Sequence, residues 1–142
     1  MQLLKEIVPN FKRVAYIDGA NPPASPEAIK IETEGRAFLA STLGITWQLF
    51  RPVVANDYEE IFARLAAEHF DAAYIPSTPF NGNNRTRICQ LALRHRIPTL
   101  SEEAGWAMCG LLLTYGQDFR WSQTRASEYI DKILRGAKPS DL

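Results

Sequence analysis

The sequence predicts an α/β fold in which a doubly wound parallel sheet of five strands lies between two helical layers. Short apolar runs alternate with longer amphipathic runs along the whole chain, and Gly, Pro and small polar residues separate them. Because right-handed crossovers join parallel strands, few topologies remain, and we predict the flavodoxin-like order 2-1-3-4-5. Without a linker, a repeat or a low-complexity stretch to divide them, residues 1–142 are expected to form a single domain.

The expected strands are short and apolar, and each helix has its own local signals. Ser25-Pro26-Glu27 combines an N-cap, a first-turn proline and an acid, and Gly44 ends the helix that follows. Asp57 and Glu60 have the spacing of a capping box at the start of the next helix. The strands are expected at residues 13–18, 46–50, 72–76, 97–100 and 111–114. Further helices are expected at residues 3–8, near residues 88–95, and in the last part of the chain up to residue 136, and a single helical turn is expected within residues 101–110.

The composition is that of a globular protein and excludes several function classes. Sixteen basic residues balance sixteen acidic ones, so the chain has no basic field for binding nucleic acid. No apolar run approaches the roughly 18 residues that cross a bilayer. The N-terminal residues do not match a signal peptide, so we expect either a cytoplasmic location or an export signal outside these residues.

Neither the cysteines nor the histidines indicate a chemical site. We expect Cys89 and Cys109 to be two small buried side chains rather than a disulfide. His69 and His95 fall near helix C-termini, where the helix dipole favours an imidazolium. Because no His, Cys or Asp cluster has metal-ligand spacing, we predict neither a metal site nor a cofactor.

The carboxyl edge of the sheet is where we expect a ligand, because open parallel sheets bind ligands outside the carboxyl ends of their strands. The loops at this edge contain hydroxyls, amides, carboxylates and aromatic rings, which are the groups that surround a small polar molecule. Two neighbours on an extended segment point to opposite sides, so at most one of the two adjacent glutamates is expected to face the ligand. The candidate ligand-binding residues are Asp18, Asn21, Ser77, Thr78, Phe80, Asn81, Glu102, Glu103 and Tyr115.

Several catalytic and nucleotide-binding motifs are missing from the sequence. A phosphate loop of the form GxxxxGK with Ser or Thr, a GxGxxG after the first strand and a GxSxG elbow do not occur. A response regulator would need an acceptor Asp after the third strand and a Lys after the fifth, where this chain has Ser77 and Tyr115. We therefore predict a binding protein rather than an enzyme.

Parts of the sequence resemble the second lobe of a family of ABC-transporter substrate-binding proteins, a group with tryptophan- and tyrosine-binding members. The resemblance starts with residues 3–9 (LLKEIVP) and 12–15 (KRVA), and continues with Asn21-Pro22 after the first strand. It includes residues 88–92 (ICQLA) with 94–98 (RHRIP), and it is strongest over residues 131–142 (DKILRGAKPSDL). The order and spacing of these segments cover essentially the whole chain.

This resemblance implies two similar α/β lobes with the ligand in the cleft between them. This chain would be one excised lobe, and its partners would be a small solute such as an amino acid, the other lobe, and the ABC permease. The full-length protein would be exported to the periplasm or another extracytoplasmic location. The chain departs from the family after the third strand, because amides that could meet a ligand's amino group arrive only at Asn81 and Asn83.

Three other interpretations share this architecture. They are the effector-binding lobe of a transcriptional regulator, the sensory domain of a signalling protein, and a small α/β enzyme that uses Asp18 or Glu103.

Overall fold

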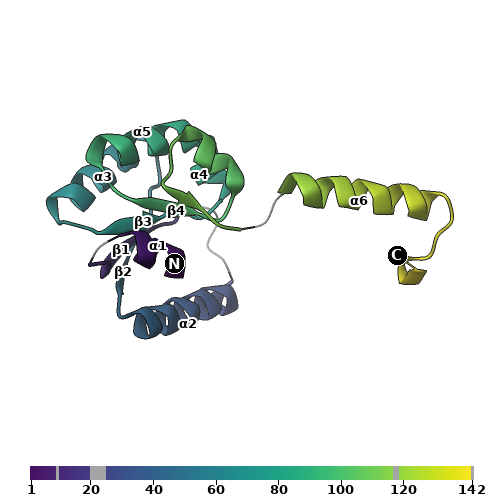
Figure 1. Cartoon of the computed structure of the whole chain (residues 1–142), viewed down its shortest axis with the longest axis horizontal. Helices are drawn as coiled ribbons and strands as arrows, with labels where there is room; N and C mark the ends of the chain where they lie inside the picture. Colours follow the sequence, from purple (N-terminus) through teal and green to yellow (C-terminus); the bar gives the residue numbers. More distant parts are fainter. Residues whose placement is uncertain (9, 20–24, 117–118, 142) are drawn as a thin grey trace.

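The computed structural model describes residues 1–8, 10–19, 25–116 and 119–141. Its centre is a five-stranded, all-parallel sheet with the order β2-β1-β3-β4-β5, which confirms the predicted topology (Figure 1). The strands are β1 (Arg13–Ile17), β2 (Thr46–Phe50), β3 (Ala72–Tyr74), β4 (Thr99–Ser101) and β5 (Leu113–Thr114).

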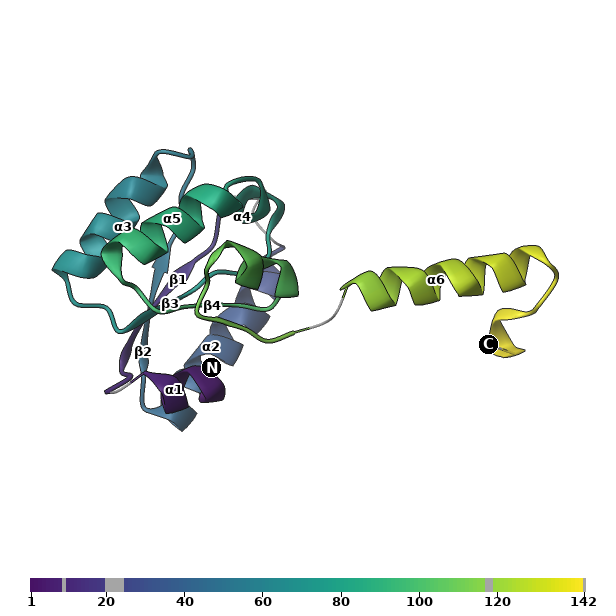
Figure 2. The same ribbon diagram turned by 45° about the horizontal axis from the view of Figure 1, so that its top comes forward.

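Helices cover both faces of the sheet, as the two views of the ribbon show (Figures 1 and 2). α3 and α5 lie side by side on one face, and α1 and α2 lie on the other. The helices are α1 (Gln2–Ile7), α2 (Pro26–Leu43), α3 (Asp57–Ala67), α4 (Pro79–Asn83), α5 (Arg85–His95) and α6 (Phe119–Leu134), with two 3-10 helices, η1 (Ala104–Cys109) and η2 (Pro139–Asp141).

The alternation of side chains along β1 divides the core into two parts. Ala15 and Ile17 point toward α3 and α5 and join the larger apolar cluster there. Val14 belongs to the second cluster, where it packs with Leu4 of α1 and Leu43 of α2. Both clusters exclude water, so burial of apolar surface holds the three layers together.

Two local predictions differ from the structure. The stretch after β3, expected as a loop, contains α4, which is too short to show apolar periodicity but is capped by Thr78, whose Oγ1 accepts from the N–H of Asn81. The prediction of a capping box at the start of α3 is wrong. Asn56 is the N-cap, and the Asp57 carboxylate instead accepts hydrogen bonds from the N–H groups of Val53 and Val54, which precede the helix.

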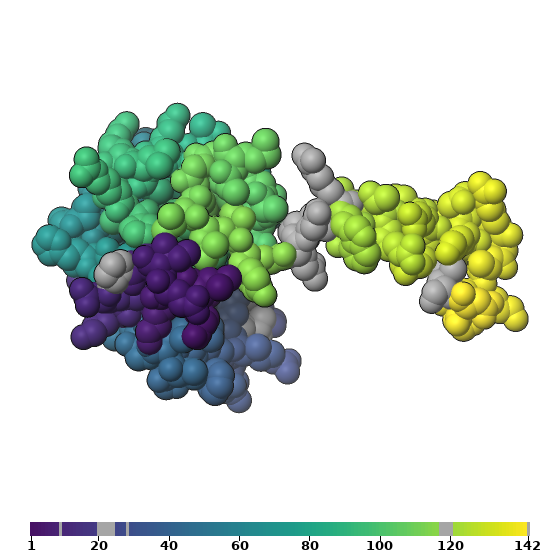
Figure 3. All heavy atoms as spheres, viewed as in Figure 1, coloured from purple at the N-terminus to yellow at the C-terminus, as the bar shows by residue number. Residues whose placement is uncertain are grey.

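The last predicted helix, in which Tyr129, Ile130, Ile133 and Leu134 share one face at helical spacing, corresponds to α6, and the structure places it away from the sheet. It forms an arm beside the α/β body in the ribbon and space-filling views (Figures 1 and 3). Its apolar side chains are exposed: Trp121 by 67%, Ile130 by 58% and Leu134 by 81%. Within the described ranges, no helix is both long and apolar enough to span a membrane.

Candidate functional site

The loops that follow β1, β3, β4 and β5 come together at the carboxyl edge of the sheet. Backbone hydrogen bonds continue the ladder up to this edge, from Asp18 N–H to the carbonyl of Phe50 (3.0 Å) and from Tyr115 N–H to the carbonyl of Ser101 (3.0 Å). The parallel register therefore places the first loop residues of neighbouring strands next to one another.

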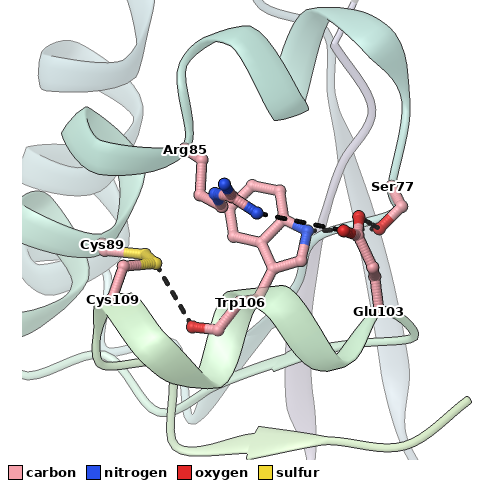
Figure 4. The surroundings of a disulfide bond; sticks show 6 residues. All are labelled: Ser77, Arg85, Cys89, Glu103, Trp106 and Cys109. Atoms are coloured by element: carbon pink, nitrogen blue, oxygen red, sulfur yellow. Dashed lines mark hydrogen bonds and ion pairs between the residues drawn. A yellow bond between two sulfur atoms is a disulfide. The ribbon is translucent and has the colours of Figure 1, made fainter. Parts of the chain in front are cut away.

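Ser77 is the centre of a hydrogen-bond network at this edge (Figure 4). Its backbone N–H donates to Glu102 Oε1 (2.6 Å), and its hydroxyl donates to Glu103 Oε2 (3.0 Å). The hydroxyl also accepts a hydrogen bond from the indole Nε1 of Trp106 (3.1 Å), a fully buried side chain of η1. The network joins the loop after β3 to the loop after β4 and fixes the rotamer of Ser77.

The expectation that at most one of the two glutamates faces the ligand stays a prediction. Both carboxylates bond to Ser77, Glu102 through the backbone and Glu103 through the side chain. β4 ends at Ser101, and Glu103 is already the N-cap of η1, so the strict alternation of strand side chains no longer applies there.

Arg85 and Trp106 are the site residues that sequence reasoning missed. Arg85, the first residue of α5, lies with its Nη1 3.9 Å from Glu103 Oε1, and Figure 4 shows its guanidinium beside the indole of Trp106. Gly105 leaves room for this pair, because a Cβ there would lie 2.9 Å from the Arg85 Nη1. No sequence motif marks either residue, since only the packing of α5 against η1 brings them together.

Glu102 has a second bond on the other side of its carboxylate. Its Oε2 accepts from the hydroxyl of Tyr74 at 2.9 Å. Burial, followed by the nearby Glu102 charge, raises the pKa of Tyr74, so this phenol stays protonated and remains a donor.

The residues of α4 form the support behind the site. Asn81 is fully buried; its side-chain NH2 donates to the carbonyls of Ile17 (2.9 Å) and Pro76 (2.8 Å), and its Oδ1 accepts from Tyr58 (2.6 Å). Phe80 stacks on the Tyr58 ring with centroids 6.0 Å apart. These contacts tie the loop after β3 to the end of β1 and to α3.

Two other predicted residues, Asp18 and Tyr115, directly follow β1 and β5. Asp18 is half-buried, and burial, followed by the charge of Glu32, raises the pKa of its carboxyl. Tyr115 is 73% exposed, so its ring is available at the rim of the edge. Asn21 lies outside the residues that the structure describes.

Cys89 and Cys109 form a disulfide, so the prediction of two separate buried thiols is wrong. The bond joins α5 to the end of η1, on the opposite side of Trp106 from Ser77 (Figure 4). The Cα atoms are 5.8 Å apart, within the usual span of a disulfide. The separation of 20 residues along the sequence does not indicate that the two cysteines are close. They meet because α5 packs against η1.

The arrangement is suited to holding a ligand by hydrogen bonds and charge. Two carboxylates with unused lone pairs, one guanidinium and a fixed hydroxyl are presented on rigid elements. Across the described ranges, no group of three or more His, Cys, Asp or Glu side chains is arranged to hold a metal ion.

Comparisons with known proteins identify solved structures that share this fold. No family model matches the chain, and no curated protein sequence matches it. Solved structures do match: a ligand-free, open substrate-binding protein with adhesive properties from Clostridium difficile has a TM-score of 0.67 and 21% identity. A conserved domain protein from Vibrio cholerae has a TM-score of 0.76 and 20% identity. An ABC domain in complex with L-Trp from Streptococcus pneumonia has a TM-score of 0.75 and 20% identity.

Each of these three matches covers 99% of this chain and 46% of the other, so the chain spans about half the length of the proteins it resembles. At such low identity the likeness concerns the fold. The chain has the α/β fold of one lobe of a periplasmic binding protein, and substrate-binding proteins are among its structural neighbours.

Proposed function

We propose that this chain is one lobe of a solute-binding protein that serves an ABC importer, and that it binds without catalysing a reaction. The observation that carries the proposal is the network around Ser77, which presents Glu102, Glu103 and Arg85 at the carboxyl edge of the sheet. This edge is where open parallel sheets receive ligands.

The rigidity of the network supports a binding role. Trp106 is fully buried and holds the Ser77 hydroxyl, while Asn81 anchors the same loop from behind. Groups held in place before a ligand arrives lose little conformational entropy when it binds. The exposed ring of Tyr115 and the loops at this edge of the sheet then supply further surface for a small polar or aromatic solute.

A second lobe completes the site in this proposal, and closure about a hinge brings the two edges together over the solute. Two observations support it: the matched proteins are about twice as long, and Ile130, Ile133 and Leu134 leave an apolar face of α6 exposed. An exposed apolar face of this kind is typical of a surface that another protein layer covers. The closed form would be the one that the permease binds.

The disulfide supports an extracytoplasmic location. Such bonds persist in oxidising compartments and are reduced in most cytosols. Cys89–Cys109 joins α5 to η1, the two elements that contribute Arg85 and Trp106 to the proposed site.

A binding screen tests the proposal. Amino acids, sugars and small aromatic acids are added to the 142-residue chain, and hits from thermal shift are titrated by calorimetry. We expect a saturable hit with a Kd of about 1 mM, because one lobe makes only part of the contacts. Ser77→Ala and Glu103→Gln should weaken it, whereas Glu34→Gln, an exposed control on α2, should not.

Two outcomes would contradict this function. A hit that Ser77→Ala and Glu103→Gln leave unchanged would place binding outside the edge. Turnover of a screened compound that Glu103→Gln abolishes would show a small enzyme instead.

A further inference from the structure

A cavity of about 360 Å³ lies on the α2 side of the sheet, next to the Ser77 network but on the other side of Glu102. This volume is within the range of small-molecule sites. The side chains that define its chemistry are Tyr16, Trp47, Tyr74, Glu32, Arg36 and Glu102.

Three aromatic rings from adjacent strands form the wall of this cavity. The centroids of Tyr16 and Tyr74 are 5.3 Å apart, and Trp47 lies 6.1 Å from Tyr16 and 6.4 Å from Tyr74. Trp47 meets both tyrosines at 75°, so the rings stand at angles to one another instead of forming one stack. Angled rings of this kind offer π-faces to a single guest, and such faces attract cations.

The charged groups that line the cavity are the carboxylates of Glu32 and Glu102, the guanidinium of Arg36 and the α-ammonium group of Met1. Glu102 accepts hydrogen bonds from two neutral donors, the Tyr74 hydroxyl (2.9 Å) and the Ser77 N–H (2.6 Å), and forms no ion pair with any described residue. Arg36, the basic residue of the lining, is already engaged. Its Nη1 lies 3.2 Å from Glu32, and its guanidinium covers the Tyr16 ring at 4.9 Å.

Trp47 adds an unused donor. Its indole Nε1 is buried and has no hydrogen-bond partner among the described residues. A buried donor without an acceptor costs about 1–3 kcal/mol, so Trp47 is a strained point in the wall of the cavity.

We propose that this cavity binds a small organic cation, a protonated amine on a planar apolar body. The ammonium group lies against the Glu102 carboxylate and the Tyr74 ring, and the planar body packs on Trp47. The proposal does not depend on the solute site at the edge. The two sites share Glu102, whose Oε2 faces the cavity through Tyr74 and whose Oε1 is bonded to Ser77.

Titration with tryptamine, followed by calorimetry and by amide shifts in NMR spectra, tests the proposal. We expect saturable binding with a Kd of about 1 mM or lower, and at least about tenfold weaker binding of indole-3-propionate, which has a similar ring and the opposite charge. Trp47→Leu and Glu102→Gln should each weaken tryptamine binding by about tenfold.

Two control variants separate this site from others. Trp121→Phe removes an exposed indole on α6 and Glu34→Gln removes an exposed carboxylate on α2; both should leave tryptamine affinity unchanged. Ser77→Ala, which alters the edge site, distinguishes the two sites. Thermal melts verify that each variant folds, and Glu102→Gln decides the matter if Trp47→Leu does not fold. Equal affinity for the anion, no saturation by tryptamine, or full affinity in Glu102→Gln would overturn the proposal. Loss of affinity in Ser77→Ala would assign the amine to the edge site and overturn it as well.

Discussion

The indole Nε1 of Trp106 donates to Ser77 Oγ at 3.1 Å, and the same hydroxyl donates to Glu103 at 3.0 Å. A fully buried side chain of η1 thus determines the orientation of a hydroxyl that belongs to the loop after β3. The site therefore depends on the position of a short 3-10 helix, which the disulfide in turn joins to α5.

Trp106→Phe should lower the free energy of unfolding by about 1–3 kcal/mol, since it removes the Ser77 bond and leaves a small cavity. Urea denaturation measures this. The control is Trp121→Phe, whose side chain is 67% exposed and which should change the unfolding free energy by less than about 0.5 kcal/mol. Equal effects of the two substitutions would contradict the role given to Trp106.

Replacing both cysteines, as Cys89→Ala with Cys109→Ala, should lower the free energy of unfolding by about 3 kcal/mol. Closing a loop of 20 residues restricts the unfolded chain by about this amount. Denaturation with and without dithiothreitol provides the measurement. The reductant should destabilise the natural sequence and leave the double variant unaffected; a natural chain that does not respond, and that shows two free thiols when unfolded, would refute the bond.

Gly19→Ala should lower the free energy of unfolding by about 1–3 kcal/mol. A Cβ at this buried position would lie 2.5 Å from Asn81 Oδ1 and 2.7 Å from the Phe80 ring, both held by the core. Gly35→Ala is the matched control: nothing lies within 4 Å of its Cβ position, and alanine in a helix should raise stability by about 0.5–1 kcal/mol. Thermal or urea unfolding of the two variants should show changes in the free energy of unfolding that have opposite signs.

Asp18→Asn should stabilise the protein increasingly as the pH rises. Folding raises the pKa of Asp18 through burial and the Glu32 charge, so its contribution is favourable below the ordinary value of 3.8 and is lost as pH rises through the folded-state pKa. The difference in Tm between Asp18→Asn and the natural chain should grow from about pH 4 to about pH 7.

Asp57→Asn gives the opposite pH profile and serves as the comparison. The N–H groups of Val54 and Val53 lower the pKa of Asp57, so its contribution is present above the unfolded-state pKa and is lost as pH falls through the folded-state value. This variant should be less stable than the natural chain near neutral pH and equal to it in acid. Parallel profiles for the two variants would contradict both assignments.

The sequence was sufficient to predict the sheet order, because apolar runs, helix signals and right-handed crossovers are local or general properties. α4 was not predicted, since five residues that include Pro79 and Gly82 show no helical period. The apolar face of α6 was predicted, but periodicity does not say which surface a helix packs on, and here the face remains exposed.

The edge of the sheet was predicted as the site, yet the contacts within it were not. Ser77, Glu102 and Glu103 come together as expected from the ends of parallel strands. Trp106, Arg85 and the disulfide depend on how η1 folds back against α5, which is a tertiary contact between segments without a motif. Such contacts arise from packing and cannot be deduced from residue spacing.

Gly116 adjoins the backbone of Glu102 so closely that a Cβ there would overlap the Glu102 carbonyl oxygen. The chain leaving β5 therefore packs directly against the chain leaving β4 at this point. A side chain at position 116 would therefore displace the segment that carries the carboxylate bordering both the edge and the aromatic cavity. A fluorophore attached at residue 115, exposed next to this junction, would convert a ligand's arrival at this carboxylate into an optical signal, and the protein would become a sensor.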